Sequence, residues 1–163
     1  MVSTLAAPDA ALIAGAVPDP ELPMLTLADL GVLAGVEQSE ELVTVWLTPT
    51  YSGCPAVAEM AADVELRLRA AGFTEVRVRL RLDPPWSTDL ITAAGRAKLA
   101  TAGIAPPSAT PLLQLGPTRL RVVECPQCGS PDTEELSRFG STACKALWRC
   151  RACREPFERM KEI

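Results

Sequence analysis

The chain has 163 residues, with 16 basic and 20 acidic side chains, a net charge of −4 and no histidine. The absence of imidazole excludes serine–histidine and cysteine–histidine triads, histidine general bases and carboxylate–histidine di-iron sites. The length permits one ordinary domain, or a domain of about 100 residues with a small module attached.

The charge is unevenly distributed along the chain. Residues 1–118 carry 7 basic and 13 acidic side chains, a net −6, while residues 119–163 carry 9 and 7, a net +2. Four thiolates on one Zn²⁺ would add about −2 to the second part, so we expect no nucleic-acid partner. No basic region precedes an apolar core near the N-terminus, and no apolar run reaches about 18 residues. We therefore expect a cytoplasmic protein with no membrane partner.

The N-terminal part predicts two short helices. An Ala-rich stretch favours helix over 9–16, and three prolines within 18–23 end it. Thr26 is expected to cap a helical turn over 27–30, which stops at Gly31.

The next elements are predicted by periodicity. Residues 32–38 and 41–48 are rich in strand formers and indicate two strands. Apolar residues then recur at helical spacing over 55–71, and Gly72 ends that helix.

Residues 73–82 alternate between apolar and basic side chains, as in a strand with two unlike faces. The apolar side chains face one way and the arginines the other: Val76, Val78, Leu80 and Leu82 against Arg77, Arg79 and Arg81. A solvated sheet face explains these arginines better than a binding stripe.

The remaining elements complete an α+β fold. Ser87 or Thr88 is expected to cap a helix that continues through 93–102. This order predicts a domain over 1–104 with a three-stranded sheet backed by helices on one face. A Pro-rich linker over 105–118 then leads to a β ribbon over 119–163.

Two Cys-x-x-Cys pairs, Cys125 with Cys128 and Cys150 with Cys153, stand 21 residues apart. Four thiolates at this spacing indicate one structural Zn²⁺ with tetrahedral ligation. A module of about 40 residues cannot bury enough apolar surface alone, so the metal would supply its folding free energy. Disulfides are the weaker alternative, because cytosolic thiols stay reduced. An iron–sulfur cluster is the other, because four cysteines hold such clusters too.

Further polar residues surround this module. Cys144 lies six residues before Cys150, which is the wrong spacing to replace a ligand of either Cys-x-x-Cys pair. It is either a buried thiol or an extra ligand or redox-active neighbour. Arg149, Arg151 and Arg154 flank the second pair, and either serve solubility or dock an acidic surface.

Cys54 is the one cysteine upstream of the module. It precedes Pro55, which suits a first helical position, so the thiol is expected at or near a helix N-terminus. There the helix dipole favours a thiolate, which is a nucleophile or a soft ligand for iron. A small buried residue in a tight turn is the alternative.

Two loops offer neighbours for this thiol. Prolines at 84 and 85 restrict Asp83 and Trp86, which suits either a site wall or a rigid corner with the indole in the core. Asp19 lies in the first Pro-rich bend. Asp19 and Glu21 offer two carboxylates at this bend, but neither has an evident acid–base partner, so a two-carboxylate hydrolase is a weak hypothesis.

Four N-terminal motifs resemble the metal–sulfur cluster biosynthesis domain of iron–sulfur assembly factors: Asp-Pro-Glu at 19–21, Asp-Leu-Gly at 29–31, Thr-Tyr-Ser-Gly-Cys-Pro at 50–55 and Asp-Pro-Pro-Trp-Ser-Thr-Asp at 83–89. The C-terminal motifs resemble the zinc ribbon of the PaaD (PaaJ) family: Cys-Pro-Gln-Cys-Gly at 125–129, Phe-Gly-Ser-Thr at 139–142, Cys-Lys-Ala-Leu at 144–147 and Cys-Arg-Ala-Cys at 150–153, followed by Glu-Pro-Phe at 155–157. Together the motifs cover nearly the whole chain.

The resemblance implies an accessory factor for the phenylacetyl-CoA epoxidase of phenylacetate degradation, without catalysis of its own. The implied partners are the di-iron oxygenase subunit, the iron–sulfur reductase and iron–sulfur assembly proteins, and a homodimer stays open. Cys54 matches the family's reactive cysteine, a transient ligand for iron or a cluster, and Asp19 and Asp83 match loops near it. Two rival hypotheses are an electron-transfer component with a permanent cluster in the Cys₄ module and a non-catalytic scaffold.

Overall fold

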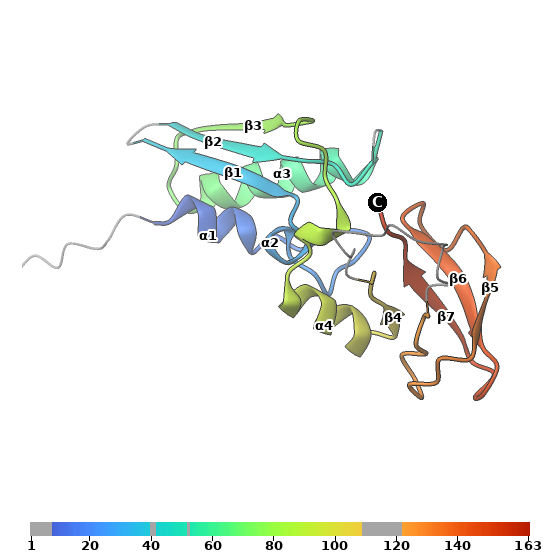
Figure 1. The fold of residues 1–163 in the computed structure, drawn as a ribbon. Coiled ribbons are helices and arrows are strands. Elements are labelled where there is room, and N and C mark those ends of the chain that lie inside the picture. The colour runs from blue at the N-terminus through green and yellow to red at the C-terminus, as the bar shows by residue number, and fades with distance from the viewer. Residues whose placement is uncertain (1–7, 40–41, 52, 109–121) are drawn as a thin grey trace, which may run out of the picture. The chain divides into compact units, whose positions relative to one another are not determined.

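The structure is a computed structural model that describes residues 8–39, 42–51, 53–108 and 122–163. The chain divides into two compact units, Met1–Trp86 and Ser87–Ile163, called unit 1 and unit 2 below. Both combine helices with a β-sheet, which confirms the α+β class (Figure 1). Within the described ranges, no helix is long and apolar enough to span a membrane.

Unit 1 is built on the three-stranded sheet predicted from the sequence. Its strands are β1 (Leu33–Gln38), β2 (Leu42–Leu47) and β3 (Glu75–Leu80), in the order β1-β2-β3. β1 and β2 are antiparallel, whereas β2 and β3 are parallel and are connected by helix α3 (Ala56–Ala70). The predicted strands and helix are confirmed to within two residues at their described ends.

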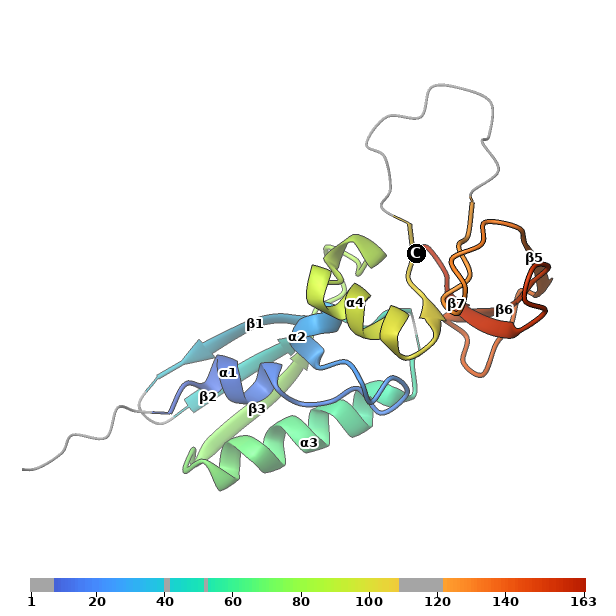
Figure 2. The ribbon, with the colours of Figure 1, turned by 90° about the horizontal axis from the view of Figure 1, so that it is seen from below.

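The helices of unit 1 lie on one face of this sheet (Figures 1 and 2). The carboxylate of Asp9 accepts two backbone N–H bonds at the start of α1 (Ala10–Gly15). α2 (Leu27–Leu30) has a reciprocal cap between Thr26 and Asp29 and ends at Gly31, whose φ is 73°. Both predicted N-terminal helices are therefore confirmed, because local capping chemistry decides where they begin and end.

The two faces of the sheet differ as predicted. β2 alternates, with Val43, Val45 and Leu47 buried toward the helices. On the opposite face the ring of Trp46 lies under two guanidinium groups, at 5.9 Å from Arg79 and 5.0 Å from Arg81. The indole therefore organises the cationic face, while the valines of β2 form the core.

Unit 2 begins with a short 3-10 turn, η1 (Thr88–Leu90), and helix α4 (Ala93–Thr101). The predicted cap at Ser87 or Thr88 is wrong for α4. Ile91 has extended backbone angles (φ −65°, ψ 123°), so the helical path is interrupted. Thr92 caps the helix instead, with Oγ1 accepting the N–H of Gly95 at 3.0 Å.

The second sheet, in unit 2, has the order β4-β7-β6-β5. The antiparallel ribbon consists of β5 (Thr133–Ser137), β6 (Lys145–Cys150) and β7 (Pro156–Met160). β4 (Ile104–Ala105) adds to it in parallel with β7, although the sequence predicts these two residues at the end of the first domain and the start of the linker. The predicted domain limits at 104 and 119 stay a prediction about independent folding, and linker residues 109–118 lie outside the described ranges.

Candidate metal centre and upstream thiol

Two turns of matching backbone geometry carry the four ribbon cysteines. The N–H of Cys125 donates to the carbonyl of Ser130 at 2.9 Å, and the N–H of Cys150 donates to that of Glu155 at 3.0 Å. The residue after each Cys-x-x-Cys pair is left-handed, with φ 74° at Gly129 and φ 68° at Arg154. The two turns therefore present their thiols in the same way, one from each end of the module.

The four sulfur atoms lie close enough to share one ion. Sγ of Cys125 is 3.7 Å from that of Cys153, Sγ of Cys128 is 3.6 Å from that of Cys150, and all four lie within 4.8 Å of one another. Sulfurs at about 2.3 Å from a tetrahedral Zn²⁺ would be about 3.8 Å apart, which fits these distances. All four are free cysteines in the structure, which favours a shared ion over the disulfide alternative.

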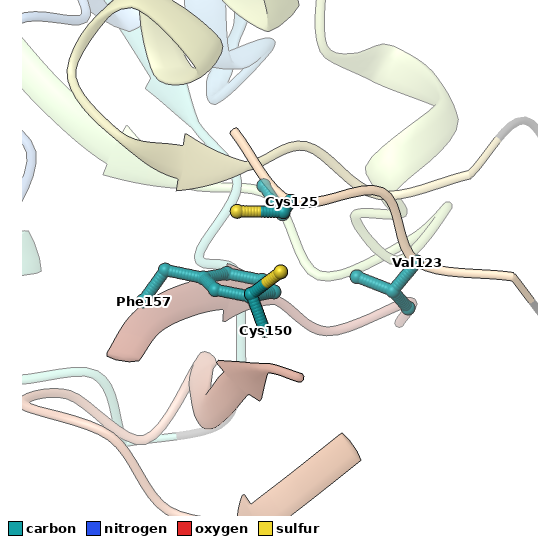
Figure 3. Close-up of a cluster of buried hydrophobic side chains, with 5 residues drawn as sticks. Val123, Cys125, Cys150 and Phe157 are labelled. Carbon is teal, nitrogen blue, oxygen red and sulfur yellow. The ribbon is translucent and has the colours of Figure 1, made fainter. Parts of the chain in front are cut away.

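The group of four cysteines is buried among apolar side chains on one side and exposed to solvent on the other. Cys125 and Cys150 belong to a buried cluster with Ala105, Val123 and Phe157, whereas Cys128 is exposed (Figure 3). The strand β4, which supplies Ala105, therefore also packs against two of the candidate metal ligands. An apolar shell limits the access of water and strengthens the attraction between thiolates and a cation.

Backbone donors favour the ligand form of one cysteine. The N–H of Cys153 points at Sγ of Cys150 at 3.4 Å and, as the largest influence, lowers the pKa of Cys150 to about 7 from an ordinary 9.0. The thiolate is the form that binds metal. This lowering does not extend to Cys153: there a backbone hydrogen bond at Glu155 acts to lower the pKa, but burial and the neighbouring thiols raise it to about 12.

Two of the three arginines beside the second pair are held by one carboxylate. Glu134 on β5 accepts hydrogen bonds from Arg149 and from Arg151, the latter at 3.0 Å. These bonds hold the pKa of Glu134 below its usual range. The pairing joins β5 to the strand that carries Cys150, so for Arg149 and Arg151 a structural role is sufficient.

Cys144 lies outside the group of four sulfurs. It precedes β6, is 4% exposed, and its Sγ is 3.1 Å from Oγ1 of Thr142. The adjacent Lys145 directs its Nζ to Glu158 at 2.8 Å. These contacts favour the interpretation as a buried thiol, and a role as an extra ligand stays a prediction.

Cys54 lies at the edge of unit 1 where α3 begins. Its N–H donates to the carbonyl of Tyr51, and its own carbonyl accepts the N–H of Val57, both at 3.3 Å. The N-cap position is Pro55, so Cys54 is one residue outside the helix. The residue is 9% exposed, at the limit between a buried and a half-buried side chain. Residue 52 of its loop lies outside the described ranges.

The parallel pairing of β2 and β3 brings the predicted neighbours to this edge. Carboxyl ends of parallel strands meet at the same sheet edge, so the loops containing Cys54 and Asp83 both leave from there. The segment between α1 and α2, which contains Asp19, extends toward the end of the unit where α3 starts (Figure 2). Asp83 is exposed.

Two of the predicted neighbours also have structural roles. Oδ1 of Asp19 accepts the N–H groups of Glu21 and Leu22 at 2.9 and 2.7 Å, which fixes the Pro-rich bend. Trp86 is 4% exposed and donates Nε1–H to the carbonyl of Leu30 at 3.0 Å. These contacts favour a core position for Trp86, and contact of either residue with the thiol stays a prediction.

Sequence reasoning missed one residue at the same edge. Thr48 follows β2 on the way to Cys54 and is 5% exposed, and its Oγ1 has no hydrogen-bond partner among the described residues. An unsatisfied buried hydroxyl is costly and uncommon in folded proteins. Threonine is ordinary at a strand end, so no signal in the sequence distinguishes it.

Comparison with known families matches both parts of the chain. The PaaD zinc beta ribbon domain matches residues 114–161. The iron–sulfur cluster assembly protein family matches residues 15–80. The two matches together contain all the cysteines considered above.

Individual relatives agree with these matches. A protein of Escherichia coli (strain K12), named as one of the subunits of 1,2-phenylacetyl-CoA epoxidase, is 46% identical over 90% of this chain and 87% of its own. An Fe-S protein maturation auxiliary factor of Porphyromonas gingivalis (strain ATCC BAA-308 / W83) is 30% identical over 50% of this chain and 78% of its own. A solved domain of unknown function, DUF59, from Bacillus anthracis is 27% identical with a TM-score of 0.51, over 55% of this chain and 87% of that one.

Proposed function

Because the chain belongs to the PaaD family of phenylacetyl-CoA epoxidase subunits, we propose that it is an accessory maturation factor for that epoxidase. In this role it assists the delivery of iron or of an iron–sulfur cluster to the oxygenase and reductase subunits, together with iron–sulfur assembly proteins. It carries out no independent catalysis.

The observation that carries the proposal is the position of Cys54 within the iron–sulfur assembly match. The thiol lies one residue before the N-cap of α3, at the sheet edge from which the loop with Asp83 also leaves. A thiolate is a soft ligand, so it suits transient contact with iron.

We assign a different task to the ribbon. Cys125, Cys128, Cys150 and Cys153 would hold one zinc ion, whose binding supplies folding free energy to the module. Two of these cysteines, Cys125 and Cys150, belong to the buried apolar cluster of the same unit. The ribbon is therefore a structural part that presents a surface to the partner subunits.

The first experiment tests Cys54 directly. We expect Cys54→Ser to lower iron and sulfide in co-expressed oxygenase and reductase subunits several-fold, because serine is a poor ligand for a soft metal. Cys144→Ser is the matched control, since this buried thiol lies outside the group of four. Unchanged metal loading and epoxidase activity in Cys54→Ser would leave a scaffold that recruits partners.

The second experiment identifies the ribbon metal. We expect anaerobically purified protein to be colourless with one zinc per chain, and Cys54→Ser to retain that zinc. Brown protein with visible absorption that disappears in Cys150→Ser would establish a permanent cluster. In that case the chain would be an electron-transfer component.

A further inference from the structure

We propose that the free edge of β3 in unit 1 binds an extended segment of a partner protein in which acidic and apolar residues alternate. The inference concerns a docking surface and does not depend on the metal chemistry proposed above. It rests on the charges, the exposed side chains and the backbone directions of one strand.

β3 is an edge strand with open hydrogen-bonding positions. Among the described residues it pairs only with β2. The N–H of Arg81 donates to the carbonyl of Leu47 at 2.8 Å, so the backbone N–H and C=O groups of Arg81 and of every second residue before it point toward β2. By alternation, the N–H and C=O groups of Val78 and Leu80 point to the free edge. Such an edge is a template for another strand.

The side chains along this edge differ between the two faces. On the helix side, Leu80 is 50% exposed, and Leu82 just beyond the strand is 66% exposed. On the opposite face lie Arg77, Arg79 and Arg81, with no helix of unit 1 covering that face (Figure 1). A partner strand would therefore meet apolar side chains on one face and cations on the other.

The three arginines form a cationic group in an otherwise acidic unit. Residues 1–86 contain 5 basic and 12 acidic side chains. The other two cations, Arg67 and Arg69, are paired on α3 with Asp63 and Glu65 at i,i+4 spacing. Within the described ranges, no ion pair joins Arg77 and Arg79 of β3, or Arg81 just beyond it, to a carboxylate.

Two of these guanidinium groups are already positioned. Arg79 and Arg81 lie over the ring of Trp46, and Arg81 also donates to the carbonyl of Ala34 at 3.4 Å. Stacking limits their rotamers, so less entropy is lost when they bind a carboxylate. Tryptophan and arginine are also among the residues most enriched at interface hot spots.

The same charges argue against a second copy of this chain as the occupant. In a two-fold antiparallel pairing of β3 with β3, the arginine faces would lie side by side. Like charges opposite each other across strands are destabilising. A partner strand with a carboxylate at every second position would instead be stabilising, because each carboxylate would lie beside a guanidinium group.

The probe is a fluorescent seven-residue peptide of alternating glutamate and valine, titrated into full-length zinc-loaded protein at low ionic strength. We expect saturable binding that weakens with salt. A matched peptide with lysine in place of glutamate should bind at least about tenfold more weakly. No saturable binding of the glutamate peptide, or equal binding of both peptides, overturns the proposal.

Two variants test separately the contribution of the arginine charge and that of the backbone groups at the free edge of β3. Arg77→Glu, which reverses an exposed charge on β3, should weaken binding about tenfold or more. Leu80→Pro removes an N–H that points to the free edge while sparing the β2 ladder, and should abolish binding. Arg67→Glu, the same change of charge on α3, should leave the affinity within about twofold.

The variants also decide between other occupants. A dimer in sedimentation that Leu80→Pro dissociates would assign the edge to a second copy and overturn the proposal. Binding of a single-stranded oligonucleotide that Arg77→Glu removes but Leu80→Pro retains would assign the arginines to nucleic acid, with the same consequence. Circular dichroism and zinc content confirm that each variant is folded.

Discussion

At the scale of single residues, the two Cys-x-x-Cys turns share one backbone requirement but meet it with different side chains. The residue after the second cysteine of each pair has a positive φ, and it is Gly129 in one turn and Arg154 in the other. Glycine adopts this conformation freely, whereas any other residue has a steric cost there. The second turn is therefore kept left-handed against the preference of its own residue.

This difference predicts opposite effects of two substitutions. Gly129→Ala should destabilise zinc-loaded unit 2 by about 1–2 kcal/mol, because no atom outside its neighbours lies within 4 Å and the cost is conformational alone. Arg154→Gly should stabilise it by up to about 1 kcal/mol. Thermal unfolding at fixed zinc concentration measures both. Ala152→Gly, in the same turn but without positive φ, should destabilise, and a stabilisation there would contradict this explanation.

At the scale of secondary-structure elements, β6 and β7 are joined by a charged pair inside the ribbon. Nζ of Lys145, 5% exposed, is 2.8 Å from Oε2 of Glu158. Burial alone would raise the pKa of Glu158, but Lys145 and the N–H of Ser141 hold it below its ordinary value. Removing one partner would leave the charge of the other buried without a counter-charge, which strongly destabilises the folded state.

We therefore expect Glu158→Gln to destabilise unit 2 by about 2 kcal/mol at pH 7, an amount reduced because Glu158 is partly exposed. The folded-state pKa is lowered, so this stabilisation is present above the ordinary value of 4.5 and is lost as the pH falls through the folded-state value. The difference between the variant and the wild type should vanish in acid. Denaturant unfolding at several pH values tests this, with Glu135→Gln, at an exposed position of β5, as the control. A difference independent of pH would exclude the ion pair as its source.

At the scale of the whole molecule, the two units depend on different sources of stability. Unit 1 has its own core of fully buried leucine and valine side chains from helices and strands alike. In unit 2, Cys125 and Cys150, two of the four candidate metal ligands, are themselves members of the buried cluster. We therefore expect the ribbon to depend on a bound ion in a way that unit 1 does not.

This dependence predicts the result of metal removal. A strong zinc chelator should abolish amide protection in β5, β6 and β7, because four unliganded thiols cannot hold the turns together. Protection in β2 and α3 should stay within a few-fold of the untreated protein. Hydrogen exchange followed by mass spectrometry reports both units in one sample. Loss of amide protection in unit 1, or retention of protection in the ribbon, would contradict the proposal that only the ribbon depends on a metal ion.

Much of the fold and of the metal site could be predicted from the sequence. The strands of unit 1, α3, the capping of α2 by Thr26 and the four ribbon cysteines are encoded by local periodicity, capping residues and ligand spacing. The cap of α4 could not be placed, because Ser87, Thr88 and Thr92 have the same capping chemistry. The backbone at Ile91 decides between them.

What the sequence alone determined is therefore the set of elements, the family and the sulfur atoms available to a metal, since each depends on residues near one another in the chain. Only the tertiary structure decided how distant segments combine. It added β4 to the ribbon and to the buried cluster around the candidate metal ligands, and brought the loops of Cys54 and Asp83 to one sheet edge. It also left the arginines of β3 without carboxylate partners among the described residues. The physical reason is that sheet pairing and burial join residues whose separation in sequence carries no periodic signal.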